Sequence, residues 1–145
     1  MRPATLASVR LITDDVDRLA AFYERVTGAT ADRPSPEFAE LRTERGTLAI
    51  GSTRTVQLFG PGSAGPADNR TAIVEFLVDD VDALFAGLDD TVPTVTPPTT
   101  MPWGNRSLLV RDPDGTLVNL FTPVSAEARE RAGVEQRGSE QAGTE

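Results

Sequence analysis

The sequence predicts an α+β fold made of two tandem βαβββ modules that together form a concave mixed sheet. Two paired landmarks carry this prediction: LITDDVDRL at 11–19 recurs as FLVDDVDAL at 76–84, and VQLFGP at 56–61 is similar to VNLFTP at 118–123. Because both pairs occur in the same order, we interpret the chain as a duplication. We place the first module at 1–60, a linker at 61–70, the second module at 71–124 and a polar tail at 125–145.

Each module is expected to begin with a strand that leads into a helix. Apolar residues alternate over 7–12 and 73–78, which is the period of a strand. The aspartate pairs at 14–15 and 79–80 then favour helix capping over general-acid chemistry. Helically spaced apolar residues define the first helix, which should end at Gly28: Val16, Leu19, Ala20, Tyr23 and Val26. We expect Tyr23 in the core with its hydroxyl at the surface. The second helix contains Val81, Leu84, Phe85 and Leu88.

Three short strands should follow each helix. The expected strands are 37–43, 47–52 and 55–59 in the first module, and 91–95, 106–111 and 117–121 in the second. Asp112-Pro113-Asp114-Gly115 is a strong turn signal between the last two. The tail is expected to start as a short helix from Ser125.

The composition limits the available chemistry. The chain lacks histidine, cysteine and lysine, so it has neither the usual general base nor a thiolate nucleophile, a Schiff-base amine or the commonest neutral metal ligand. A net charge of −8 argues against binding to nucleic acid or to an anionic membrane surface. With no signal peptide and no run as long as a membrane span, a cytoplasmic protein is expected.

The motif Phe22-Tyr23-x-x-Val26-x-Gly28, with the Asp112–Gly115 turn and the duplicated βαβββ pattern, resembles the vicinal oxygen chelate superfamily. This is the group of glyoxalase I, bleomycin-resistance proteins and extradiol dioxygenases. In its metal-dependent members, the resemblance implies His or Glu ligands on the first and last strand of each module. The matching positions here are Ser8, Gln57, Ile73 and Asn119. These residues suit a divalent transition metal poorly, so we expect no metal and no cofactor.

Strand alternation predicts a concave pocket with apolar walls and a few polar groups. The candidate ligand-binding residues are Ser8, Arg10, Phe38, Gln57, Phe59, Ile73, Glu75, Trp103, Asn105, Asn119 and Phe121. Simpler alternatives are that Trp103 fills the core and that Gln57 and Asn119 hydrogen-bond backbone or each other. Two pairs are a further alternative: Phe59 packed on Phe121, and Arg10 in an ion pair with Glu75.

These features favour a binding protein over an enzyme, and no catalytic residue is assigned. The resemblance to the metal-free bleomycin-resistance branch implies a homodimer with shared cavities that sequesters a bulky natural-product antibiotic and confers self-resistance. Suitable ligands are a glycopeptide, an aromatic polyketide or an anthraquinone-fused enediyne. Two alternatives stay open: a metal-free enzyme with Glu75 as general base and Arg10 or Asn119 polarising an oxygen, and a degenerate module with a filled cavity that serves as an interaction partner.

Overall fold

The computed structural model describes residues 2–134, which fall into two compact units. The first unit contains residues 2–72 and the turn 112–116, and the second contains residues 73–111 and 117–134. The part of the predicted tail beyond residue 134 lies outside the described residues. No helix of the described chain is long and apolar enough to cross a membrane.

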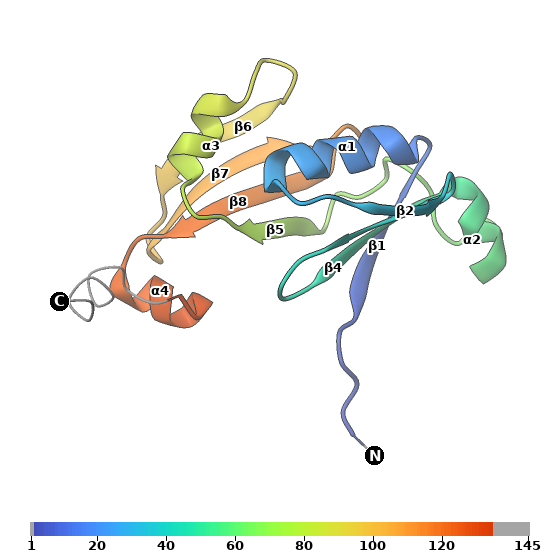
Figure 1. Cartoon of the computed structure of the whole chain (residues 1–145), viewed down its shortest axis with the longest axis horizontal. Helices are drawn as coiled ribbons and strands as arrows, with labels where there is room; N and C mark the ends of the chain where they lie inside the picture. The colour runs from blue at the N-terminus through green and yellow to red at the C-terminus, as the bar shows by residue number, and fades with distance from the viewer. Residues whose placement is uncertain (1, 135–145) are drawn as a thin grey trace. The chain divides into compact units, whose positions relative to one another are not determined.

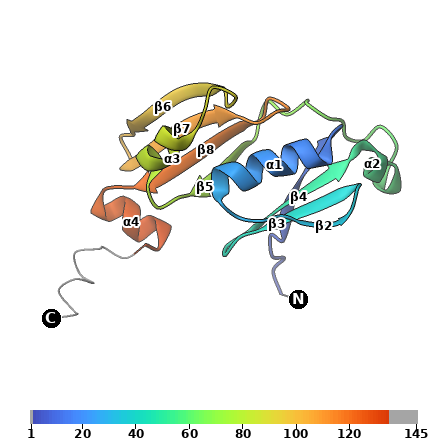
Figure 2. The same cartoon turned by 45° about the horizontal axis from the view of Figure 1, so that its top comes forward.

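The first unit is a four-stranded sheet covered on one face by a helix (Figure 1, Figure 2). Its strands have the order β1-β4-β3-β2, in which β1 and β4 are parallel and the other pairs antiparallel. Helix α1 packs on β3 and β4. The bounds are β1 Ser8–Thr13, α1 Val16–Thr27, β2 Asp32–Ser35, β3 Phe38–Arg42 and β4 Thr47–Ser52.

Helix α1 confirms its sequence prediction. Asp15 caps its start by accepting a 3.0 Å hydrogen bond from the backbone N of Arg18, and Gly28 ends it with a φ of +77°. Its buried residues are the five predicted ones. The hydroxyl of Tyr23, however, is not at the surface: it donates to Asp112 in the turn that completes this unit, so that part of the prediction is wrong.

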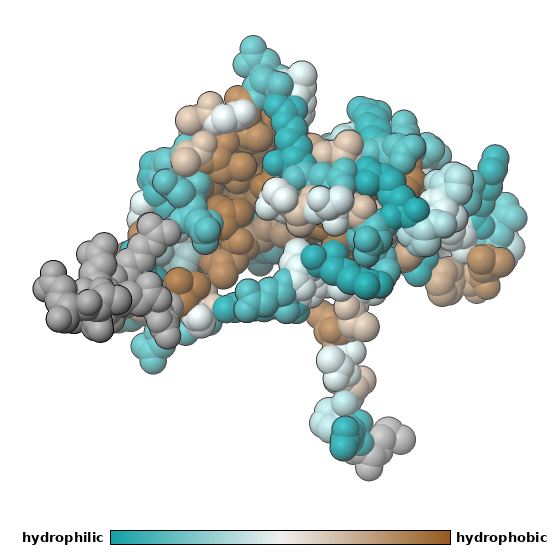
Figure 3. Space-filling model, viewed as in Figure 1, coloured by the Kyte–Doolittle hydropathy of each residue, from teal (hydrophilic) through white to brown (hydrophobic). Residues whose placement is uncertain are grey.

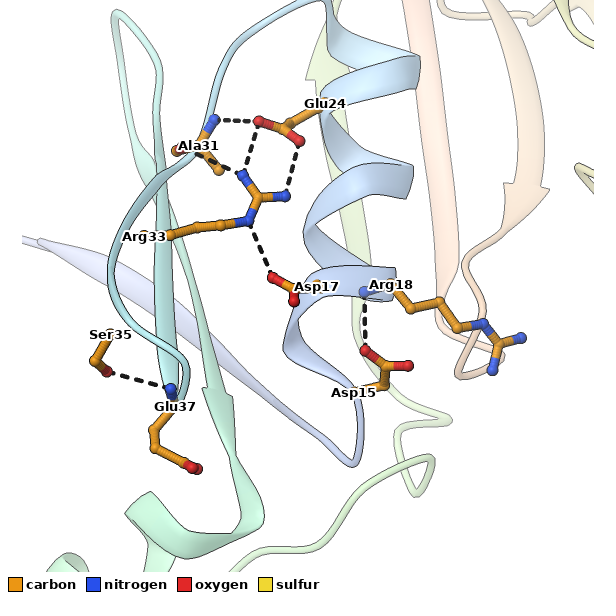
Figure 4. Close-up of polar contacts among 8 residues, drawn as sticks. All are labelled: Asp15, Asp17, Arg18, Glu24, Ala31, Arg33, Ser35 and Glu37. Atoms are coloured by element: carbon orange, nitrogen blue, oxygen red, sulfur yellow. Dashed lines mark hydrogen bonds and ion pairs between the residues drawn. The ribbon is translucent and has the colours of Figure 1, made fainter.

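An arginine ties the segment after α1 back to the helix (Figure 4). Arg33 donates two hydrogen bonds to the carboxylate of Glu24, at 2.9 and 3.1 Å, and a third to Asp17 at 3.3 Å. Glu24 also accepts the backbone N–H of Ala31 at 2.8 Å, and the Arg33 guanidinium is the main reason that the pKa of Glu24 lies below its ordinary value. This network fixes β2 beside the helix.

The predicted strand at 55–59 is wrong, because these residues belong to helix α2, Thr53–Phe59. Ser52 caps α2 by accepting from the backbone N of Arg54, and Gly60 ends it. Only Val56 of the helix is buried, whereas Leu58 is 87% exposed and Phe59 is 73% exposed. Apolar surface is correspondingly visible over the end of α2 (Figure 3). The first module therefore has β4 as its last strand.

The second unit repeats the arrangement with the strand order β5-β8-β7-β6, and β5 and β8 are its parallel pair. Helix α3 packs on β6, β7 and β8 and is capped by Asp80, which accepts from the backbone N of Ala83. The aspartates thus act as caps, as predicted. The bounds are β5 Ile73–Leu77, α3 Val81–Gly87, β6 Thr94–Thr100, β7 Asn105–Arg111 and β8 Leu117–Pro123.

Strand β6 lies later than the predicted 91–95 and includes Pro97 and Pro98. It is an edge strand with irregular register, where a missing N–H is tolerated, so the prolines do not prevent pairing with β7. The predicted helix after Ser125 is confirmed as α4, Ala126–Ala132. It begins beside Gly104, where an added Cβ would lie 2.0 Å from Oγ of Ser125.

Candidate functional site

Each sheet has one face packed under its helix and an opposite face, which we call its open face. In the second unit, Leu108, Val110, Val118 and Leu120 are fully buried, while the residues between them on β7 and β8 point to the open face. Thr122 confirms this assignment, because its hydroxyl accepts the first backbone N–H of α3 at 3.0 Å. The open face carries Ile73, Glu75, Leu77, Asn105, Ser107, Leu109, Asn119 and Phe121.

Asn119 and Glu75 are paired neighbours on this open face. The side-chain N of Asn119 donates a 2.8 Å hydrogen bond to the carboxylate of Glu75, and the two residues are directly opposite in the β5–β8 register. This bond fixes the amide so that its Oδ1 is left as an acceptor. Oδ1 is buried and has no hydrogen-bond partner in the structure. A ligand that donates a hydrogen bond would supply one.

Two further polar atoms of β7 share this condition. Ser107 is only 3% exposed, and its Oγ has no partner, nor does Oδ1 of Asn105. Buried polar atoms without partners cost free energy and are uncommon in native proteins, so several on one face point to a ligand or ordered water. Apolar Phe121 and Leu109, which lie opposite Ser107 and Asn119, separate these atoms.

The open face of the first sheet has a different chemistry. The guanidinium of Arg10 lies over the ring of Phe38 at 4.8 Å and over the ring of Phe59 at 5.2 Å. Arg10 and Glu75 were predicted as a possible ion pair, and Phe59 as a partner of Phe121. Instead, the contacts found for these residues pair Arg10 with Phe38 and Phe59 in the first unit, and Glu75 with Asn119 in the second.

The strand registers correct the predicted correspondence between Gln57 in the first module and Asn119 in the second. Arg10 lies opposite Ala49, as Glu75 lies opposite Asn119. The counterpart of Asn119 in the first module is therefore Ala49 and not Gln57, which is exposed on α2. The same register makes Gly51 the counterpart of Phe121. Ser8 and Ile73 keep their predicted equivalence at the starts of β1 and β5.

Trp103 lies in the turn between β6 and β7 and is 57% exposed, so the alternative that it fills the core is wrong. Its backbone carbonyl accepts a 2.7 Å hydrogen bond from Arg131. Ser107 and Gly51 were missed by the sequence analysis. Alternation along β7 from Asn105 would have found Ser107, but Gly51 required the position of α2.

The comparisons with known proteins agree with this architecture. The model of the Glyoxalase/Bleomycin resistance protein/Dioxygenase superfamily matches residues 5–120. The chain belongs to this superfamily. Among curated proteins, none matches it. Solved structures share the superfamily fold at 20–22% sequence identity, and this likeness shows the fold but not the function.

Three of these structures illustrate the likeness. A glyoxalase/bleomycin resistance protein/dioxygenase from Nocardioides has a TM-score of 0.66 and 20% identity, with 87% of each chain covered. A family enzyme from Burkholderia phytofirmans PsJN has a TM-score of 0.70 and 22% identity, covering 83% of this chain and all of that one. A protein of unknown function from Agrobacterium tumefaciens str. C58 has a TM-score of 0.72 and 22% identity, with 84% and 96% covered.

The metal site of the superfamily's metal-dependent members does not fit this chain. With the corrected register, the four corresponding positions hold Ser8, Ala49, Ile73 and Asn119. Alanine and isoleucine have no donor atom, and a neutral hydroxyl and an amide are weak ligands for a transition metal. The described residues also contain no group of three or more His, Cys, Asp or Glu side chains that could hold a metal ion.

Proposed function

We propose that this protein binds and sequesters a bulky natural-product antibiotic without a metal ion, and so confers self-resistance. The ligand class is a glycopeptide, an aromatic polyketide or an anthraquinone-fused enediyne. The proposal is carried by the open face of the second sheet, where buried acceptors without partners alternate with apolar side chains. Membership of a superfamily that includes bleomycin-resistance proteins is consistent with it.

The chemistry of this face matches a ligand with several N–H or O–H groups on an apolar framework. Asn105 and Asn119 have acceptor oxygens and Ser107 a hydroxyl that are buried without partners, and Glu75 adds an exposed carboxylate. Phe121 and Leu109 supply apolar surface between them. A few orienting polar groups among apolar walls is the usual character of a small-molecule site.

Fluorescence of Trp103, the single tryptophan, gives the direct test. We expect a saturable change when bleomycin, an anthracycline or an anthraquinone-fused enediyne is titrated, because Trp103 lies just before Asn105, the first residue of β7. Asn119→Ala should weaken the binding by about tenfold, equivalent to ~1.4 kcal/mol. Asn69→Ala, which removes an amide from the loop before β5, is the matched control and should leave affinity unchanged.

Two results would overturn this proposal. One is that none of the three antibiotic classes binds saturably to the folded protein. The other is chemical conversion of the ligand, detected by mass spectrometry after incubation, which would favour the metal-free enzyme. Binding with recovery of unchanged ligand supports sequestration.

We also propose that the protein is a homodimer. Leu6 is 85% exposed and two large apolar residues of α2, Leu58 and Phe59, are also exposed in the single chain. Each sheet has two edge strands. Exposed apolar side chains and open edges are typical of surfaces that pair with a second copy. Light scattering should give twice the chain mass of 15.5 kDa, and a monomeric mass would contradict the proposal.

A further inference from the structure

The guanidinium of Arg10 lies over two phenyl rings on the open face of the first sheet. Its carbon lies 4.8 Å from the ring centroid of Phe38 on β3 and 5.2 Å from that of Phe59 on α2. Stacking on rings uses the faces of the guanidinium and leaves its N–H donors, which lie in its plane. Contact with both rings therefore restrains this planar set of donors.

The absence of a side chain at Gly51 leaves space for the side chain of Arg10. A Cβ added at residue 51 would lie 3.4 Å from a terminal nitrogen of Arg10 and 2.8 Å from Oγ1 of Thr55. The backbone of β4 is thus approached closely by Arg10 and by α2, which a side chain would prevent. At the corresponding place in the second sheet stands Phe121, opposite Leu77 and diagonal to Glu75.

The carboxylates near this stack already have cationic partners. Glu37 is paired with Arg54 at 3.1 Å and accepts a hydrogen bond from Ser52, and Glu40 is paired with Arg42 at 2.9 Å. Among the described residues, Arg10 has no carboxylate within ion-pairing distance. Arg10 is therefore a positive charge without a neighbouring negative partner, although the chain as a whole has a net charge of −8.

We propose that Arg10 is the anchor of a second binding site, which recognises the carboxylate of an aromatic acid. The planar donors of Arg10 match a carboxylate in a two-bond arrangement, and an orientation fixed in advance lowers the entropy lost on binding. The exposed ring of Phe59 offers apolar contact beside the charge. All residues named for this site belong to the first unit, so the inference does not rest on the proposed antibiotic binding.

The test is titration of the ¹⁵N-labelled protein with 2-naphthoate while the Nε–H signal of Arg10 is followed by NMR. That signal is assigned by its loss in Arg10→Lys. We expect a saturable shift with 2-naphthoate and binding at least about tenfold weaker with the neutral analogue 2-naphthamide, because the amide lacks the charge that strengthens the two hydrogen bonds.

Variants separate this site from a general effect of charge. Arg10→Lys keeps the charge but loses the planar fork, and Phe59→Ala removes an exposed ring, so both should weaken 2-naphthoate binding. Arg42→Lys changes an exposed arginine that already has a carboxylate partner and should leave binding unchanged. The proposal is overturned if 2-naphthamide or inorganic phosphate binds as tightly as 2-naphthoate, if Arg42→Lys weakens binding as much as Arg10→Lys, or if the Arg10 signal does not shift.

Discussion

The hydroxyl of Tyr23 donates a 2.7 Å hydrogen bond to Oδ2 of Asp112, which lies 89 residues further along the chain. Tyr23 is completely buried, and Asp112 is buried as well. The other oxygen of Asp112 accepts the backbone N–H groups of Asp114 and Thr116, at 2.8 and 3.0 Å. One carboxylate thus shapes the turn before β8 and binds that turn to helix α1.

Tyr23→Phe should lower the free energy of unfolding by about 1–3 kcal/mol, because it leaves a buried carboxylate oxygen without its donor. Urea denaturation followed by circular dichroism measures this loss. In an Asp112→Asn background the same substitution should cost less, since the tyrosine hydroxyl there no longer donates to an ionised carboxylate. Equal losses in the two backgrounds would show that the effect does not come from this hydrogen bond.

Alkaline pH should unfold the protein before Tyr23 ionises in the folded state. Burial, followed by the nearby charge of Asp112, raises the pKa of Tyr23 above its ordinary value near 10. The unfolded chain therefore loses this proton first, so the contribution to stability is full below about pH 10 and falls as the pH rises further.

Phenolate absorbance measures this effect for a single group, because the chain has one tyrosine. The absorbance should appear together with loss of the circular dichroism signal, and Tyr23→Phe should flatten the dependence of stability on pH above 10. A normal phenolate titration near pH 10 in protein that remains folded would contradict the prediction.

Ser107→Ala should lower the affinity for the antibiotic without lowering the stability of the protein. Its Oγ is buried without a partner, so removing it from the ligand-free protein should leave the free energy of unfolding unchanged or raise it by up to ~1 kcal/mol. The same change should weaken antibiotic binding if the hydroxyl contacts the ligand. Thermal unfolding and fluorescence titration of the same preparation provide the comparison. A clear loss of stability would indicate a structural role for the hydroxyl instead.

Gly51→Ala should destabilise the protein by about 1–3 kcal/mol, because the new methyl group would overlap with Oγ1 of Thr55. Thr55→Ala removes that atom, so Gly51→Ala should lower the free energy of unfolding much less in a Thr55→Ala background than in the unchanged chain. Gly46→Ala is the matched control, since nothing lies within 4 Å of a Cβ there. Chemical denaturation of the four variants tests the coupling, and additive losses would show that Thr55 is not the obstacle.

The fold was predictable where local pattern and tertiary context agree. Asp15, the apolar stripe of α1 and Gly28 all indicate the helix that forms. The pair VQLF and VNLF shows the opposite case, because one segment is helix α2 and the other is strand β8. In β8, Val118 and Leu120 are both buried, whereas Leu58 of α2 points to solvent. Burial by the rest of the fold decides between the two structures, and four residues do not encode it.

The sequence predicted which strand residues share a face, but not their contacts. Alternation correctly placed Arg10 and Glu75 on the strand face opposite the helix. The partner of Arg10 could not be found, because Phe59 reaches it only through α2. The sequence repeat equated Gln57 with Asn119. The strand registers show instead that Ala49 is the residue of the first module that corresponds to Asn119.

The turn at 112–116 has a consequence for any attempt to separate the halves of this duplicated chain. It belongs to the first unit, although the strands on either side of it belong to the second. A fragment that stops at residue 72 would keep the buried phenol of Tyr23 and lose its acceptor. The two halves of the duplicated chain are therefore no longer interchangeable at the boundary between the modules. A chimera that takes its first half from this chain must also take the DPDG turn, because Tyr23 of α1 binds that turn.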